Sequence, residues 1–91
     1  MNTDAGTDRL SQLAISASGF VFDPRSGATF TVNDTGRTII EGLRDGSGLD
    51  DIVSALKDAF ATDRADLRRD TLEYVRQLRD QGLLPADFEL V

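Results

Sequence analysis

Alternating apolar and polar residues in the first third of the chain predict short β-strands. The clearest alternation covers residues 28–32, where apolar residues are separated by threonines. A period of two is typical of a strand with one buried face. Residues 10–16 and 19–23 are similar, and in the second of these Phe20 and Phe22 share a face. Because turn-forming residues join these segments, we expect three strands in an antiparallel sheet.

Beyond the last of these strands, apolar residues recur every three to four positions, which predicts helices. The expected helices cover residues 34–44, 49–60 and 64–81. Asn33 stands where the N-cap of the first helix belongs, since its side chain can accept a hydrogen bond from a free backbone N–H. Gly82 is a suitable residue to end the third helix. Sheet and helices thus occupy separate parts of the chain.

This order of elements predicts an α+β fold in which a three-stranded antiparallel sheet is followed by three helices. Two helices joined by a three-residue turn are typical of a helix-turn-helix, so the expected architecture is winged-helix-like. Ninety-one residues suit one domain. We assign residues 9–84 to this domain, residues 1–8 to a disordered N-terminal lead-in and residues 85–91 to a C-terminal tail.

The composition excludes several kinds of chemistry. The chain has no cysteine and no histidine, which removes thiol catalysis, histidine acid–base catalysis and nearly all zinc sites. We therefore expect no catalytic residue, no metal site and no cofactor. The lack of disulfides is typical of a cytoplasmic protein.

The charge balance bears on possible partners. Sixteen acidic and ten basic residues give a net charge of −6. Such a field disfavours nucleic acid and anionic membrane surfaces. No apolar stretch of about 18 residues predicts a membrane span.

One ordered set of residues extends from the third expected strand to the end of the third expected helix. Its members are Gly27, Phe30, Val32, Asn33, Thr35, Gly36, Ile39 or Ile40, Leu43, Ile52, Leu56, Phe60, Leu67, Asp70, Val75, Leu78, Gly82, Leu83 and Leu84. This set resembles the PqqD family, which takes its name from protein D of pyrroloquinoline quinone biosynthesis. The resemblance covers about residues 13–84 and leaves out the tail that contains Phe88.

The resemblance implies a peptide-recognition domain. Members of this family bind the leader segment of a ribosomally made precursor peptide and present it to a modifying enzyme, often a radical S-adenosylmethionine enzyme. The leader adds a strand to the sheet, in the groove between the third strand and the third helix. On this reading, the peptide-binding edge consists of Ala28, Thr29, Phe30, Thr31 and Val32, whose backbone groups would pair with the guest. The alternative is an ordinary strand edge with a solvated face.

A stripe on the third expected helix is a second candidate contact for the peptide. Arg69, Leu72, Arg76 and Arg79 are spaced three, four and three residues apart, so they share one face. An apolar residue among guanidinium groups suits a peptide with an apolar anchor and carboxylates, because arginine can bind a carboxylate through two N–H groups. The alternative is a solvated face on which arginines pair with acids four residues further along.

Two other functions remain open at this level. A winged-helix DNA-binding transcriptional regulator would use the third helix, which holds five of the ten basic residues. Against this, the same helix and its cap hold five acids, so the helix is formally neutral. A structural homodimer would pair through the open strand edge or the tail.

Overall fold

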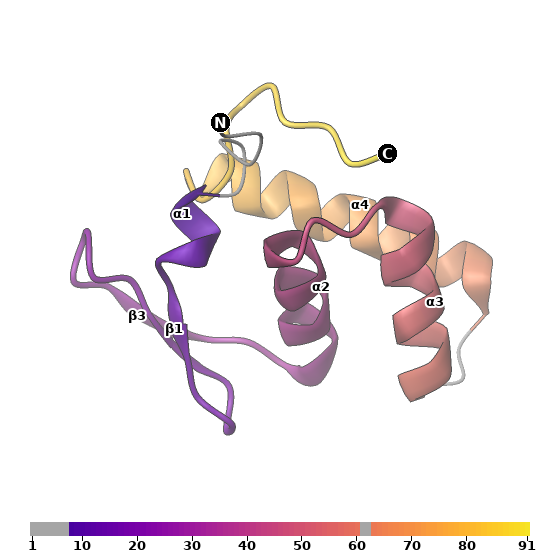
Figure 1. The fold of residues 1–91 in the computed structure, drawn as a ribbon, viewed down its shortest axis with the longest axis horizontal. Helices are drawn as coiled ribbons and strands as arrows, with labels where there is room; N and C mark the ends of the chain where they lie inside the picture. The colour runs from indigo at the N-terminus through magenta and orange to yellow at the C-terminus, as the bar shows by residue number, and fades with distance from the viewer. Residues whose placement is uncertain (1–7, 61–62) are drawn as a thin grey trace.

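The computed structural model describes residues 8–60 and 63–91, and it places a small sheet at one end of a helical bundle (Figure 1). The elements are α1 (Asp8–Ser11), β1 (Ala14–Ile15), β2 (Phe20–Phe22), β3 (Thr29–Thr31), α2 (Asp34–Arg44), α3 (Leu49–Phe60) and α4 (Arg64–Asp80). The expected α+β order, a three-stranded antiparallel sheet followed by three helices, is confirmed. Within the described residues, no helix has the length and apolar character needed to cross a membrane.

The first strand is shorter than expected because α1 takes up its beginning. The strand expected over residues 10–16 is reduced to Ala14–Ile15. Leu10 and Leu13 are both buried, and the N–H of Leu13 donates to the carbonyl of Leu10 at 3.2 Å. In an extended strand, residues three apart face opposite sides, whereas a helical turn directs both into the core. Asp8 belongs to this turn, and the rest of the lead-in expected over residues 1–8 lies outside the described residues.

The sheet has the order β1-β2-β3 and is antiparallel throughout. Val21 in the central strand pairs with Ile15 on one side and Phe30 on the other. Residues directly opposite in antiparallel strands point to the same face, so these three form the inner face of the sheet. Val21 is 1% exposed, whereas Phe20 and Phe22 are 61% and 44% exposed on the outer face.

The helices begin and end where the sequence signals predict. Asn33 caps α2, and its Oδ1 accepts a hydrogen bond from the N–H of Gly36 at 2.8 Å. At the other end of the bundle, Gly82 follows α4 with a φ of 80°, a conformation that glycine adopts without strain. The N–H of Leu83 then donates to the carbonyl of Leu78 at 2.9 Å. This turn directs the chain back onto the bundle.

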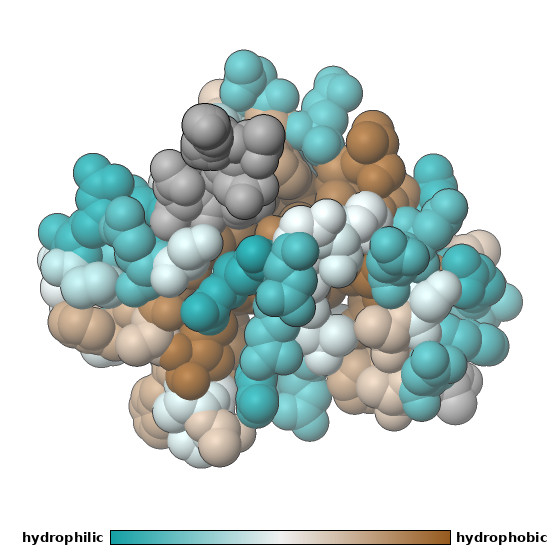
Figure 2. Space-filling model, in the orientation of Figure 1, coloured by the Kyte–Doolittle hydropathy of each residue, from teal (hydrophilic) through white to brown (hydrophobic). Residues whose placement is uncertain are grey.

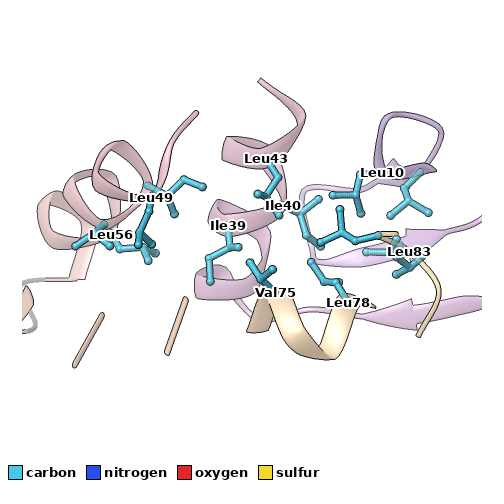
Figure 3. Packing of buried hydrophobic residues seen from close by; sticks show 14 of the residues in the cluster. Leu10, Ile39, Ile40, Leu43, Leu49, Leu56, Val75, Leu78 and Leu83 are labelled. Carbon is cyan, nitrogen blue, oxygen red and sulfur yellow. The ribbon is translucent and has the colours of Figure 1, made fainter. Parts of the chain in front are cut away.

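The core lies where α1, α2 and α4 meet (Figure 3). Leu10, Ile40, Leu78 and Leu83 point toward one another in this region. Leu56 of α3 extends the same cluster and is fully buried. On the surface seen in Figure 2, hydrophilic side chains cover α2, and apolar residues reach the solvent over β1.

The C-terminal tail, residues 85–91, runs back along α4 toward the start of α3 (Figure 1). Arg79 Nη1 donates to the carbonyl of Phe88 at 2.6 Å, and the N–H of Leu49 donates to the carbonyl of Val91 at 2.8 Å. Phe88 and Leu90 pack against the core and are partly buried. The tail therefore lies on the helices and does not extend the sheet.

Candidate functional site

The outer edge of β3 has no partner strand among the described residues. The sheet ends with β3, which pairs only with β2. The N–H of Val32 donates to the carbonyl of Gly19 at 2.9 Å, and the N–H of Asp23 donates to the carbonyl of Ala28 at the same distance. Both bonds join residues that are directly opposite each other in the register of the two strands.

These two bonds fix which backbone groups face outward. In an antiparallel pair, successive residues direct their N–H and C=O groups alternately toward and away from the partner. Ala28, Phe30 and Val32 therefore direct theirs toward β2, while Thr29 and Thr31 direct theirs away from the sheet. Both threonines are exposed. The edge thus offers two residues whose backbone groups can receive an added strand.

One flank of α4 lies against the start of α2, the helix that follows this strand. A β-carbon built on Gly36, at the start of α2, would lie 2.8 Å from the Tyr74 hydroxyl oxygen and 3.0 Å from Cζ. Tyr74 is half-buried, and this burial raises the pKa of its phenol. Phe30, Val32 and Tyr74 are partly buried and pack against the core. Phe30 and Val32 supply apolar side chains on the inner side of the open edge, and Tyr74 lies against the start of the helix that follows it.

The expected arginine stripe lies on a different flank of α4. With about 100° between successive helical residues, Leu72 and Arg76 lie about 160° around the helix from Tyr74. Arg79 is on the same side as these two and is bound to the tail through the carbonyl of Phe88. That the stripe and the strand edge line one groove therefore stays a prediction; the phase of α4 places Tyr74 against the start of α2 and Arg79 against the tail.

The members of the stripe also differ in their contacts. Arg69 forms ion pairs with Asp66 at 3.2 Å and with Asp70 at 3.8 Å. Local pairing with acids is therefore present, though not with Glu73, the acid four residues further along. Leu72 is 40% exposed. Among the ion pairs of the described residues, none includes Arg76. This surface combines one apolar side chain with the exposed Arg69 and Arg76, while Arg79 is half-buried against the tail.

A buried carboxylate holds the turn that leads into β3. Asp23 is 3% exposed, and its Oδ2 accepts from Arg9 Nη2 at 2.6 Å and from Ser26 Oγ at 3.1 Å. Its Oδ1 accepts from the N–H of Arg25 at 3.0 Å. The hydrogen bond from Arg9 is the main reason that the pKa of Asp23 lies below its usual value, and the Arg25 and Ser26 bonds act in the same direction against the effect of burial. This network fixes the β2–β3 turn and so positions the edge.

The sequence did not reveal two features of this region. Periodicity places Tyr74 on the inner face of the third expected helix, but its contact with Gly36 at the start of α2 was not foreseen. The exposure of Phe20 and Phe22 was also not foreseen, although their shared face was.

Within residues 8–60 and 63–91, no three His, Cys, Asp or Glu side chains gather in a way that could hold a metal ion.

The fold and its open edge define a small winged-helix-like module of the kind that can accept a guest strand. Residues 19–84 match the family of coenzyme PQQ synthesis protein D (PqqD), and the chain belongs to this family. The resemblance noted from the sequence is thereby confirmed. Among curated proteins, none matches the chain.

Two solved structures resemble this one. The first is a lasso peptide synthetase B1 complexed with the leader peptide; it is 31% identical, the match covers 77% of this chain and 84% of that chain, and the TM-score is 0.66. The second is TbiB1 in complex with the TbiA(beta) leader peptide; it is 23% identical, with 85% and 91% of the two chains covered and a TM-score of 0.71. The second likeness concerns the fold alone.

Proposed function

We propose that this protein is a non-catalytic adaptor that binds the leader of a ribosomally synthesised precursor peptide and presents it to a modifying enzyme. The leader would add to the sheet as a fourth strand along β3. A radical S-adenosylmethionine enzyme is one such partner, and a cytoplasmic location is in keeping with ribosomal synthesis of the peptide. The proposal needs no catalytic residue and no cofactor in this chain.

The observation that carries the proposal is the outward direction of the backbone groups of Thr29 and Thr31. Strand addition requires free N–H and C=O groups on an extended edge, together with pockets for alternate side chains of the guest. The half-buried side chains of Phe30 and Val32 supply an apolar surface on the inner side of that edge, and Tyr74 packs against the start of the following helix. The 31% identical structure is itself a complex with a leader peptide, which supports the same use of the fold here.

The charges on α4 give little support to DNA binding. Arg68 pairs with Asp50 at 3.6 Å, Arg69 pairs with two acids of its own helix, and Arg79 donates to the tail. Arginines engaged in this way release few counterions from a DNA backbone, and the net charge of −6 opposes approach. We therefore favour the peptide-binding role over a transcriptional regulator.

The proposal is tested with leader segments of candidate precursor peptides, each labelled with a fluorophore and titrated by anisotropy. Thr31→Pro removes an outward N–H and leaves the bonds to β2 in place, so it is expected to weaken peptide binding by about tenfold or more. Thr31→Val keeps the N–H and is the matched control, with affinity expected to stay within about twofold of wild type. Wild-type affinity in the proline variant would exclude this edge.

Amide hydrogen exchange gives a second, independent test of the same edge. In the free protein, the N–H groups of Phe30 and Val32 are expected to be protected, because they bond to β2, and those of Thr29 and Thr31 to exchange quickly. Saturation with the peptide should protect the two threonine amides selectively. Unchanged exchange at both threonines, or a shift of mixed-sequence DNA in electrophoresis, would contradict the proposed role.

A further inference from the structure

The outer face of the sheet carries an exposed aromatic pair that the peptide edge does not use. Phe20 and Phe22 of the central strand are 61% and 44% exposed. They line a shallow hollow of about 300 Å³ together with Ala14 of β1 and Thr29 of β3. Large apolar side chains gathered on the surface of a small domain typically mark an interaction site.

The chemistry of this face is uniform. None of the residues that line the hollow is charged, although charged residues make up 29% of the chain. The core does not require the two phenylalanines, because Val21 fills the inner face at the same point of β2. The partner that matches such a surface is apolar and uncharged, and its binding would be driven by removal of apolar area from water.

The face is too small to hold a partner firmly by itself. Strands spaced about 4.8 Å apart with a rise of about 3.4 Å per residue give three short strands an area of roughly 150 Å². Stable interfaces bury about 800 Å² on each side. A second copy of this chain packed face to face on the sheet would therefore bury too little area, whereas a larger partner can also contact a bound leader and the elements beside the sheet.

The peptide edge is continuous with this face. Thr29 lines the hollow with its side chain and directs its backbone groups outward to the open edge. A strand added there would widen the face by about 4.8 Å, and every second side chain of the guest would point to the same side as Phe20 and Phe22. The combined surface exists only when the peptide is bound.

We infer that the outer face of the sheet, centred on Phe20 and Phe22, is the docking surface for an apolar patch of the peptide-modifying enzyme, and that the bound leader completes this surface. The inference rests on the proposed function and deepens it. The adaptor alone binds the enzyme weakly, and the adaptor with leader binds it tightly, so recruitment depends on the substrate.

The test uses the full chain, a leader peptide that binds it in the anisotropy titration, and the modifying enzyme that acts on that precursor. Binding of the adaptor to immobilised enzyme is measured with and without saturating peptide. For wild type, the peptide is expected to tighten enzyme binding by about tenfold or more. The double variant Phe20→Ser, Phe22→Ser should lose this gain while its affinity for the peptide stays within about twofold of wild type.

Leu72→Ser is the matched control, since it removes an apolar side chain of similar exposure from α4. It should recruit the enzyme as wild type does. Thermal unfolding of each variant checks that the fold is intact. Should the double variant unfold, the single variant Phe20→Ser, at the more exposed position, decides the same question.

The outcomes distinguish failure of the docking inference from failure of the proposed peptide-binding function. Enzyme binding that the double variant retains, or that the peptide does not strengthen in wild type, overturns the inference while leaving peptide binding intact. Loss of peptide binding in the double variant, with its fold preserved, also overturns it, because the face would then belong to the peptide site. A dimer of the chain alone that the double variant dissociates in light scattering would assign the face to self-association instead.

Discussion

Gly36 at the start of α2 lies directly against the phenol of Tyr74 in α4. A β-carbon at Gly36 would be 2.8 Å from the hydroxyl oxygen and 3.0 Å from Cζ of that side chain. The contact joins the start of α2, the helix that follows β3, to α4. It therefore fixes how closely these two helices approach each other at this point.

Gly36→Ala is expected to destabilise the protein. Helix propensity alone would favour alanine by about 1 kcal/mol, but overpacking against Tyr74 typically costs about 1–3 kcal/mol. We expect the packing effect to win, and urea unfolding to report a lower free energy of unfolding. The double variant Gly36→Ala, Tyr74→Phe removes the nearest atom and should recover part of the loss; a more stable single variant would contradict the close contact.

Asn33→Ala should shorten or fray the start of α2. The side chain of Asn33 satisfies the N–H of Gly36 at 2.8 Å, and loss of such a cap costs about 0.5–2 kcal/mol. Asn33→Asp retains an acceptor and adds a charge that the helix N-terminus favours, so it should match wild type. Equal stability of the alanine and aspartate variants in thermal unfolding would show that the cap contributes nothing.

Asp23 should make stability depend on acid pH. Its pKa is lowered in the folded protein, chiefly by the hydrogen bond from Arg9. The stabilisation is therefore complete above the ordinary carboxyl pKa of 3.8 and is lost as the pH falls through the lower, folded value. Asp23→Asn should be less stable than wild type at about pH 7, and the difference should shrink as the pH falls to about 3 and below.

Asp45→Asn is the control for this experiment, because Asp45 is exposed at the end of α2. Its stability should stay within about 0.5 kcal/mol of wild type at both pH values. If the difference between wild type and Asp23→Asn does not change over this range, the Arg9–Asp23 bond does not stabilise the fold.

The two flanks of α4 should respond differently to substitution. Leu72→Asp alters the stripe that lies about 160° from Tyr74, so peptide affinity should change by less than about twofold. Tyr74→Ala removes apolar surface beside the open edge and should weaken the peptide by about tenfold. Both affinities are measured by anisotropy titration. A large loss for Leu72→Asp with little change for Tyr74→Ala would show that the arginine stripe contacts the peptide.

Local signals in the sequence were sufficient for the helices. Asn33 marks the start of α2 through one side-chain hydrogen bond, and Gly82 marks the end of α4 through one φ value. All three predicted helix ranges agree with the structure to within one residue. Residues 10–16 were harder, because Leu10 and Leu13 suit either a strand or a turn by composition. Both side chains are buried in the structure, and a helical turn, unlike a strand, can bury residues three apart.

The candidate site was predicted in part, for a physical reason. Alternation placed Phe20 and Phe22 on one face, but which face is buried depends on Ile15 and Phe30, which pair with Val21 across the sheet. In the same way, periodicity grouped the arginines of α4 correctly and left open which side of the helix faces the sheet. Both questions concern the rotation of one element against its neighbours, which no short segment encodes.

The course of the tail has a practical consequence for experiments with this protein. Because Val91 is hydrogen-bonded to Leu49 at the start of α3, a linker or label joined after it emerges beside the helices, on the opposite flank of α4 from Tyr74. Tethering the protein to a sensor through Val91 therefore leaves the open edge of β3 accessible to the solution.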